Sequence, residues 1–135
     1  MATETATPMT FSDTERTLRL DEIKAAHGAA PWSHELGSTN GTRAVLICQA
    51  PGHRNDTHYH EADEWWFIVE GEQTWTFLDS GVTHHVRAGD FVFAPGRAIH
   101  HIEVTGDAPA IRLAMSAMGE FHRYDRPGCV PKEQA

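Results

Sequence analysis

Short apolar runs separated by turn residues make up most of the chain after residue 40. The runs are rich in β-branched and aromatic residues, and each is followed closely by Gly, Pro or Asp, a pattern typical of strands joined by tight turns. The predicted strands cover residues 43–49, 65–69, 73–78, 82–87, 91–94, 98–104 and 111–117. Because no stretch after residue 40 has a helical period, we predict an all-β, antiparallel sandwich or closed barrel.

The first forty residues have a different pattern. They begin with a polar, Thr-rich stretch and continue with a short apolar run, an amphipathic stretch and a segment rich in turn residues. We expect a loose segment over residues 1–15, a strand over 17–20, a helix over 21–27 and a loop over 31–41. Asp21 can cap the helix and Gly28 can end it.

Length and charge limit the class of protein. A chain of 135 residues is the size of one domain, and its net charge of −8 disfavours nucleic acid and anionic membranes as partners. No apolar run is long enough to span a bilayer, and the N-terminus lacks the basic and apolar regions of a signal peptide. We therefore expect a cytoplasmic protein.

The chain contains ten histidines, and three of them form a pattern with a glutamate. His58 and His60 are two residues apart, so on a strand both side chains point to one face, and Glu64 can return to that face after a bend. His100, on a later strand, is the natural further ligand. Imidazole nitrogens with a carboxylate oxygen suit Fe, Mn, Co, Ni, Cu or Zn, so we predict one divalent transition metal, with Fe(II) favoured.

The surrounding residues carry a family resemblance. Residues 52–71 resemble the first signature of the cupin superfamily, with its two glycines, two histidines and glutamate all present. Residues 89–100 resemble the second signature, although Arg97 stands where the family has Gly, and Val104 where it has Asn. The resemblance implies a double-stranded β-helix (jelly-roll) barrel in which His58, His60, Glu64 and His100 bind one metal.

This resemblance also divides the chain. We expect a single domain over residues 1–135, with an N-terminal strand and helix extension over 1–40, the barrel over 41–118 and a C-terminal tail over 119–135. Residues 53–67 are also similar to the metal-binding stretch of 3-hydroxyanthranilate dioxygenases. Those enzymes use two His and one Glu, so the additional His58 is a departure.

Alternation along the strands predicts the lining of a substrate pocket. If Glu64 and His100 point inward, so do several apolar residues. Each of these, taken singly, can equally well belong to the hydrophobic core and have no contact with a ligand. The candidates are Trp66, Ile68, Trp75, Phe77 and Ile102, with Arg54 as a candidate carboxylate ligand. Arg43, Arg97 and Arg112 are alternatives to Arg54, while a surface position is the commoner place for any one arginine.

Two functional classes remain open. An open His and Glu site with Fe(II) favours a dioxygenase acting on a small aromatic or enolisable carboxylate, and with Mn, Ni or Zn a non-redox isomerase, lyase or decarboxylase. Tyr59 or His84 could then serve as a base. A metal-dependent small-molecule-binding barrel without turnover is the non-enzymatic alternative. We assign no role to His27, His34, His53 or His122.

The expected assembly is a homodimer. Trp65, Phe67 and Val69 should point away from the barrel interior, and they are too apolar to remain in contact with water. The strand expected over residues 17–20 could then cover the sheet edge of a partner.

Overall fold

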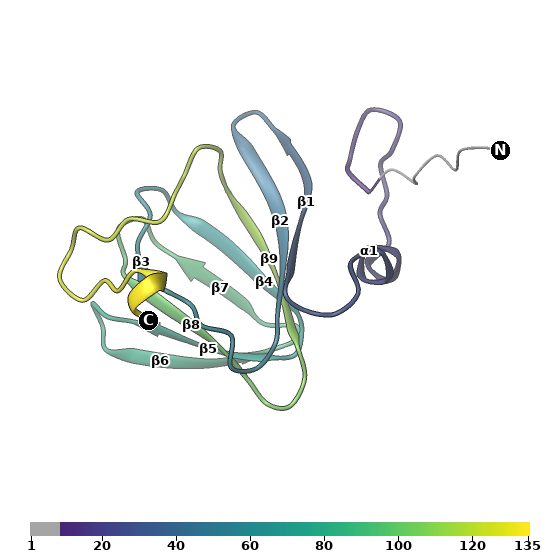
Figure 1. Ribbon diagram of the computed structural model, residues 1–135. Coiled ribbons are helices and arrows are strands. Elements are labelled where there is room, and N and C mark those ends of the chain that lie inside the picture. Colours follow the sequence, from purple (N-terminus) through teal and green to yellow (C-terminus); the bar gives the residue numbers. More distant parts are fainter. Residues whose placement is uncertain (1–8) are drawn as a thin grey trace.

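The structure is a computed structural model that describes residues 9–135. The first eight residues, which belong to the segment expected to be loose, lie outside the described part. Within residues 9–135, two antiparallel sheets face one another and enclose the core (Figure 1). This arrangement confirms the predicted all-β barrel.

The larger sheet has the strand order β1-β2-β9-β4-β7 and the smaller one the order β3-β8-β5-β6. The strands of the larger sheet are β1 (Trp32–Thr39), β2 (Thr42–Gln49), β9 (Ala110–Ala117), β4 (Glu64–Glu70) and β7 (Phe91–Ala94). Those of the smaller sheet are β3 (Thr57–His58), β8 (His100–Thr105), β5 (Glu72–Phe77) and β6 (Val82–Arg87). All seven predicted strands are present, two of them with the predicted ends.

The prediction of a loop over residues 31–41 is wrong, because β1 occupies most of this segment. β1 is an edge strand that pairs with β2, with Trp32 opposite Cys48 and a shift in register between Glu35 and Gly37. A turn at Asn40 and Gly41 joins the two strands. A polar edge strand with an irregular register lacks the alternation on which the prediction depended.

The strand expected over residues 17–20 is also wrong. Helix α1 (Leu20–His27) begins there, Asp21 does not cap it, and Gly28 ends it with a φ of 75°. Ile23 is buried on the outer face of the larger sheet, in a cluster that includes Leu46 and Ile111. The apolar residues that suggested a strand therefore lie in the segment that leads into the helix and on the buried side of the helix itself.

The N-terminal segment is held against the sheet from Met9 onward, not loose. The backbone N–H of Phe11 donates to the carbonyl of Leu36 on β1 at 2.7 Å. The Met9 carbonyl lies 2.7 Å from Nε2 of His34. Met9 and Phe11 thus hold this segment against the β1 edge of the larger sheet.

The segment expected as a C-terminal tail, residues 119–135, runs back over the smaller sheet (Figure 1). Isolated bridges join Tyr59 to Arg123 and Thr57 to Val130. A short 3-10 helix, η1 (Lys132–Gln134), follows. The tail therefore lies beside the strand that carries His58.

No helix in the described residues is long and apolar enough to cross a membrane. The cellular location stays a prediction.

Part of the larger sheet's outer face is apolar and open. Trp65 is 56% exposed and Phe91 79% exposed, and exposed Phe93 and Met115 flank Trp65 on the neighbouring strands. The ring centroids of Trp65 and Phe93 are 4.6 Å apart. Val69 lies on the same face, as expected, and is covered there because it packs against the cluster around Ile23. Helix α1 therefore covers one half of this face and leaves the other half open.

We propose that this open half pairs two copies of the chain, since contiguous apolar surface of this kind marks interaction sites. Light scattering at micromolar concentration should give twice the mass of the chain. Replacing both Trp65 and Phe91 with Lys should halve the mass, because two desolvated charges would oppose association. Val82→Lys, an exposed apolar position on the smaller sheet, is the control. A monomeric wild type would exclude the dimer.

Candidate metal centre

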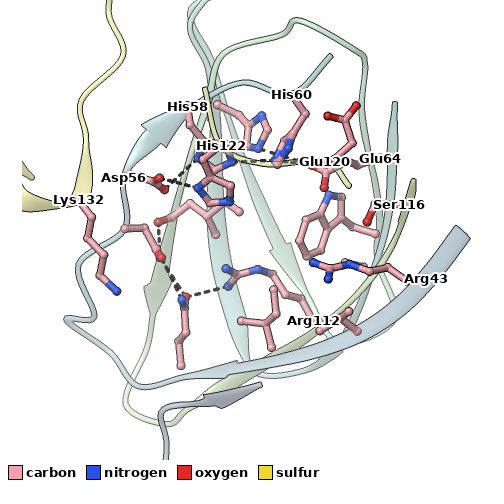
Figure 2. A pocket seen from close by; sticks show the side chains of 18 of the residues that line it. Arg43, Asp56, His58, His60, Glu64, Arg112, Ser116, Glu120, His122 and Lys132 are labelled. Carbon is pink, nitrogen blue, oxygen red and sulfur yellow. Dashed lines mark hydrogen bonds and ion pairs between the residues drawn. The ribbon is translucent and has the colours of Figure 1, made fainter. Parts of the chain in front are cut away.

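Three histidines and one glutamate converge on the inner side of the barrel. Nε2 of His58 lies 3.0 Å from Nε2 of His60, and Nε2 of His60 lies 3.2 Å from Oε1 of Glu64. Nε2 of His100 lies 3.9 Å from the same glutamate oxygen. All four side chains are buried. The structure thus brings together the four residues that the sequence predicted as ligands, and Figure 2 labels three of them, His58, His60 and Glu64.

Strand register and one tight turn position these residues. β3 pairs with β8 so that His58 stands opposite His100. The turn before β8 packs against the bend between His60 and Glu64, where the N–H of Arg97 donates to the His60 carbonyl at 2.6 Å. A Cβ on Gly96 would meet the carbonyl oxygen of residue 61 at 2.4 Å, so only glycine permits this approach.

Hydrogen bonds on the far side of two rings select the tautomer that a metal needs. Nδ1 of His58 lies 2.9 Å from Oδ1 of Asp56, and Nδ1 of His100 lies 3.1 Å from the Ala98 carbonyl. Because each Nδ1 donates its proton to an oxygen, each Nε2 keeps a free lone pair directed toward the cluster.

Burial keeps these imidazoles neutral. It lowers the pKa of both His60 and His100 to about 3, with the neighbouring His58 acting in the same direction. Burial also raises the pKa of the Glu64 carboxyl to about 7. Within residues 9–135, Nε2 of His100 and Oε1 of Glu64 are buried and have no hydrogen-bond partner. Such unsatisfied atoms fit a bound cation, so the buried triad of His58, His60 and His100 can hold a metal ion.

A fifth polar group stands beside the cluster, and sequence reasoning missed it. The ring of His122 stacks on that of His58, with centroids 3.5 Å apart and planes 7° apart. Its Nδ1 donates to Asp56 at 2.5 Å, and the Tyr124 hydroxyl donates to the same carboxylate. Burial alone would raise the pKa of Asp56, but the hydrogen bonds from His122, His58 and Tyr124 hold it well below its usual value.

No sequence signal indicated His122, because it belongs to neither signature and lies in the C-terminal segment. Its place beside His58 depends on the bridge between Tyr59 and Arg123. Asp56, His58 and His122 also form a cluster that could hold a cation. Asp56 thus orients both rings: that of His58, a predicted ligand, and that of His122, which was not predicted.

The cluster faces an open cavity of about 370 Å³, and His122 and Lys132 of the C-terminal segment border it (Figure 2). Its apolar lining comes mainly from β2, β4 and β9, through Val45, Ile47, Trp66 and Ala114. The polar lining consists of Arg43, Gln49, Asn55, Asp56, Arg112, Ser116, Glu120, His122, Tyr124 and Lys132. The cavity is more polar than the alternation of the strands suggested.

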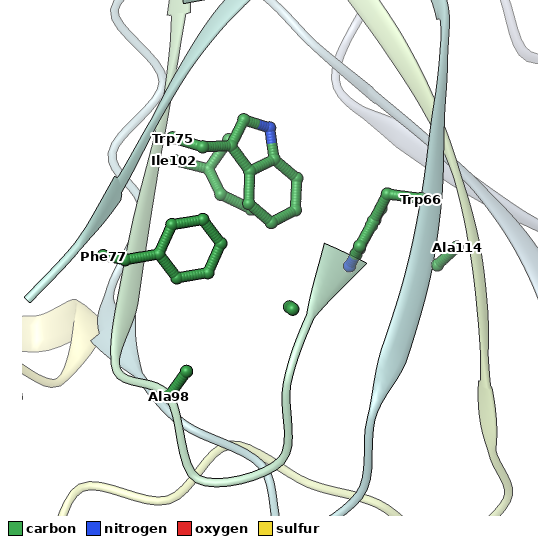
Figure 3. Close-up of a cluster of buried hydrophobic side chains, with 7 residues drawn as sticks. Trp66, Trp75, Phe77, Ala98, Ile102 and Ala114 are labelled. Atoms are coloured by element: carbon green, nitrogen blue, oxygen red, sulfur yellow. The ribbon is translucent and has the colours of Figure 1, made fainter. Parts of the chain in front are cut away.

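The structure divides the predicted pocket residues into three groups. Trp66 and Ile102 line the cavity. Trp75 and Phe77 point inward as expected, but they pack with Ile102 and Ala98 in the core between the sheets (Figure 3). Ile68 is likewise fully buried and does not line the cavity.

Arg54 lies elsewhere. It borders a separate surface hollow, and its Nη1 donates to the Ala135 carbonyl at 3.1 Å. Neither candidate base borders the cavity: the Tyr59 hydroxyl donates to Asp125, and His84 is exposed on β6. Of the four arginines that the sequence offered, Arg43 and Arg112 line the cavity; Arg43 is exposed and Arg112 is buried.

Comparison with known proteins agrees with this architecture. The cupin domain family matches residues 45–116, more than half of the chain. A curated relative named 3-hydroxyanthranilate 3,4-dioxygenase, from Xanthomonas oryzae pv. oryzae, is 38% identical over 58 residues. That match covers 42% of this chain and only 33% of the relative, so the chain spans about a third of its length.

Solved structures share the fold. A conserved protein with a double-stranded β-helix domain from Klebsiella pneumoniae has a TM-score of 0.65 at 23% identity, with 79% of this chain and 96% of that one covered. Oxalate decarboxylase from Bacillus subtilis has a TM-score of 0.52 at 27% identity, over 57% of this chain and 22% of that one. With both signatures, the two sheets and the matched domain in agreement, the chain belongs to the cupin family.

Proposed function

We propose that this cupin is a metal-dependent dioxygenase acting on a small aromatic or enolisable carboxylate. Its ligands are His58, His60, His100 and, as the fourth, Glu64. The convergence of these four side chains beside an open cavity is the observation that carries the proposal. A metal held by these four residues would keep room for substrate beside O₂ on its cavity side.

Fe(II) in this site would supply the electrons that activate O₂. The protein's own part is to hold the ligand geometry and to select what enters. Asp56 and the Ala98 carbonyl fix the His58 and His100 rings. The indole of Trp66 and the side chain of Ile47 give the cavity an apolar wall against which a flat ring can pack.

The likeness to the Xanthomonas 3-hydroxyanthranilate 3,4-dioxygenase supports an oxygenase with an aromatic acid substrate. It supports the reaction class more than the substrate itself, because the match covers a third of that protein. Arg54, the residue that sequence reasoning placed in the pocket, gives no support, since it lies outside the cavity.

A non-redox lyase, isomerase or decarboxylase is the second candidate, and one specific observation favours it. Besides the ligand Glu64, two carboxylates line the cavity: Asp56, which accepts hydrogen bonds from His58, His122 and Tyr124, and Glu120 from the C-terminal segment. Oε1 of Glu120 accepts the N–H of Ala62 at 2.6 Å. A second carboxylate near the metal can move a proton, as acid–base chemistry requires. A barrel that binds a small molecule without turnover is the third possibility.

The metal assignment predicts unequal effects for two histidines, one on the inner side of the barrel and one outside it. His60→Ala should lose most of the bound metal, because it removes a ligand nitrogen. His101→Ala should keep it, since His101 points out of the barrel toward Thr57 and Glu103. Elemental analysis of both variants, purified in parallel and loaded with Zn(II), measures the difference. Equal losses would contradict the assignment.

Metal affinity should fall as the pH is lowered from 8 to 6. The pKa of Glu64 is raised to about 7 in the metal-free protein, so below pH 7 the carboxyl holds a proton that the metal must displace. His60 and His100 stay neutral over this range because burial lowers the pKa of each to about 3, and burial lowers the pKa of His58 as well. The apparent Zn(II) affinity should drop about tenfold per pH unit below 7, as expected for one displaced proton.

The control for this pH effect is Glu64→Gln, which cannot titrate. It should bind Zn(II) more weakly and with a flatter pH profile, as measured by competition with a chelator. An equally steep profile in Glu64→Gln would assign the displaced proton to another group.

The oxygenase proposal predicts that the Fe(II)-loaded protein consumes O₂ when given a small aromatic or enolisable acid. Glu64→Ala should abolish the uptake, and His101→Ala should retain it. An oxygen electrode with a panel of hydroxylated benzoates and 2-oxo acids provides the measurement. If the Fe(II), Mn(II) and Ni(II) forms all leave O₂ untouched while one of them converts a substrate anaerobically, the second candidate replaces the first.

A further inference from the structure

Arg112 is a buried cation without an anion. It lies on β9, is 4% exposed and lines the cavity that the metal cluster faces. Among the described residues, no carboxylate lies within ion-pair distance of its guanidinium. Its Nε has no hydrogen-bond partner there. Figure 2 shows the side chain reaching from the sheet into the cavity.

Neutral groups hold the guanidinium in place. Nη1 of Arg112 donates to Oε1 of Gln49 at 2.9 Å. The Gln49 amide is itself fixed by two hydrogen bonds with Asn55, at 2.9 and 3.0 Å, and Asn55 donates to the Ile102 carbonyl. This chain of amides orients the arginine and leaves its charge uncompensated.

An uncompensated buried charge is costly, and proteins rarely keep one without a use for it. Burial lowers the pKa of Arg112 to about 10, while the more distant Glu64 and Asp56 act in the opposite direction. The guanidinium therefore remains charged at neutral pH. An anion entering the cavity would find a preorganised donor and would remove the cost of the isolated charge.

The rest of the cavity restricts what that anion can be. Arg43 and Lys132 add positive charge at the exposed mouth, which favours the entry of an anion. The guanidinium of Arg112 lies 5.5 Å from the centroid of the Trp66 ring, and Ala114, two residues further along β9, lines the same cavity. The uncharged part of a ligand held by Arg112 would thus contact an aromatic and apolar surface.

We propose that Arg112 binds the carboxylate of the ligand that occupies this cavity, with the organic part of the ligand packed against Trp66. The assignment rests on the proposed function in taking the cavity as a small-molecule site beside the metal cluster. It does not require that the reaction be an oxygenation. Arg112 is then the residue that determines selectivity for acids over their neutral analogues.

Calorimetry with benzoate and benzamide tests this assignment, because the two probes share a ring and differ in charge. Both are titrated into metal-free protein and into the redox-inert Zn(II) form. Wild type should prefer benzoate by about tenfold or more, the size of one charge-assisted hydrogen bond. Arg112→Gln should remove that preference and leave benzamide binding unchanged. Arg54→Gln, outside the cavity, should bind both probes as wild type does.

Two further arms make each outcome decisive. Inorganic phosphate should compete poorly with benzoate, and equal competition would replace the carboxylate site with a general anion site. If Arg112→Gln fails to fold, Arg112→Lys keeps the charge without the planar donor fork and should weaken benzoate binding several-fold. Unchanged benzoate binding in a folded Arg112 variant, or no preference for benzoate in wild type, overturns the proposal.

The outcome is separable from that of the O₂ measurements. Benzoate binding that depends on Arg112, in a protein that leaves O₂ untouched, would retain the carboxylate site and exclude the oxygenase. Oxygen uptake with an acid substrate at an unchanged KM in Arg112→Gln would retain the oxygenase and exclude Arg112 as the carboxylate site.

Discussion

The pairing of β3 with β8 is the constraint on which the metal cluster depends. It sets His58 opposite His100, and a slip of one residue would bring Thr57 and His101 to the inner face instead. Two residues of strand are too few to hold such a register alone. The pairing is reinforced on its other side by the bridge between Thr57 and Val130 and, at the turn before β8, by the contact of Gly96 with the bend after His60.

That turn also explains why a departure from the family signature leaves the site intact. Arg97 has a φ of 70°, a left-handed conformation that favours glycine, which is the residue of the signature at this position. The side chain is directed to the surface, where its Nη1 lies 3.1 Å from Glu61. Arg97 thus adopts the backbone conformation of the glycine it replaces, at the cost of some strain. Its side chain forms an ion pair with Glu61, on the bend between the ligands His60 and Glu64.

Sequence patterns identified the parts of the molecule that follow from local rules. Alternation assigned the inner and outer faces of β4 correctly, so that Trp66 lines the cavity and Trp65 faces outward. Alternation cannot give the position of an inward residue along the barrel axis, and for this reason Trp75 and Phe77 were expected at the cavity and lie in the core. His122 and Glu120 escaped prediction because long-range contacts, not strand periodicity, bring them to the site.

The C-terminal segment places Glu120, His122, Tyr124 and Lys132 around the cavity, whereas the matched cupin domain ends at residue 116. The metal-holding barrel and much of its entrance are thus encoded in separate stretches of the chain. Substitutions at Glu120 or Lys132, which line the cavity but make neither of the bridges to Thr57 and Tyr59, can change which molecules enter while the histidine cluster stays in place. A shared barrel therefore does not imply a shared substrate. Two cupins with the same metal ligands can differ in chemistry because different segments outside the barrel line their cavities.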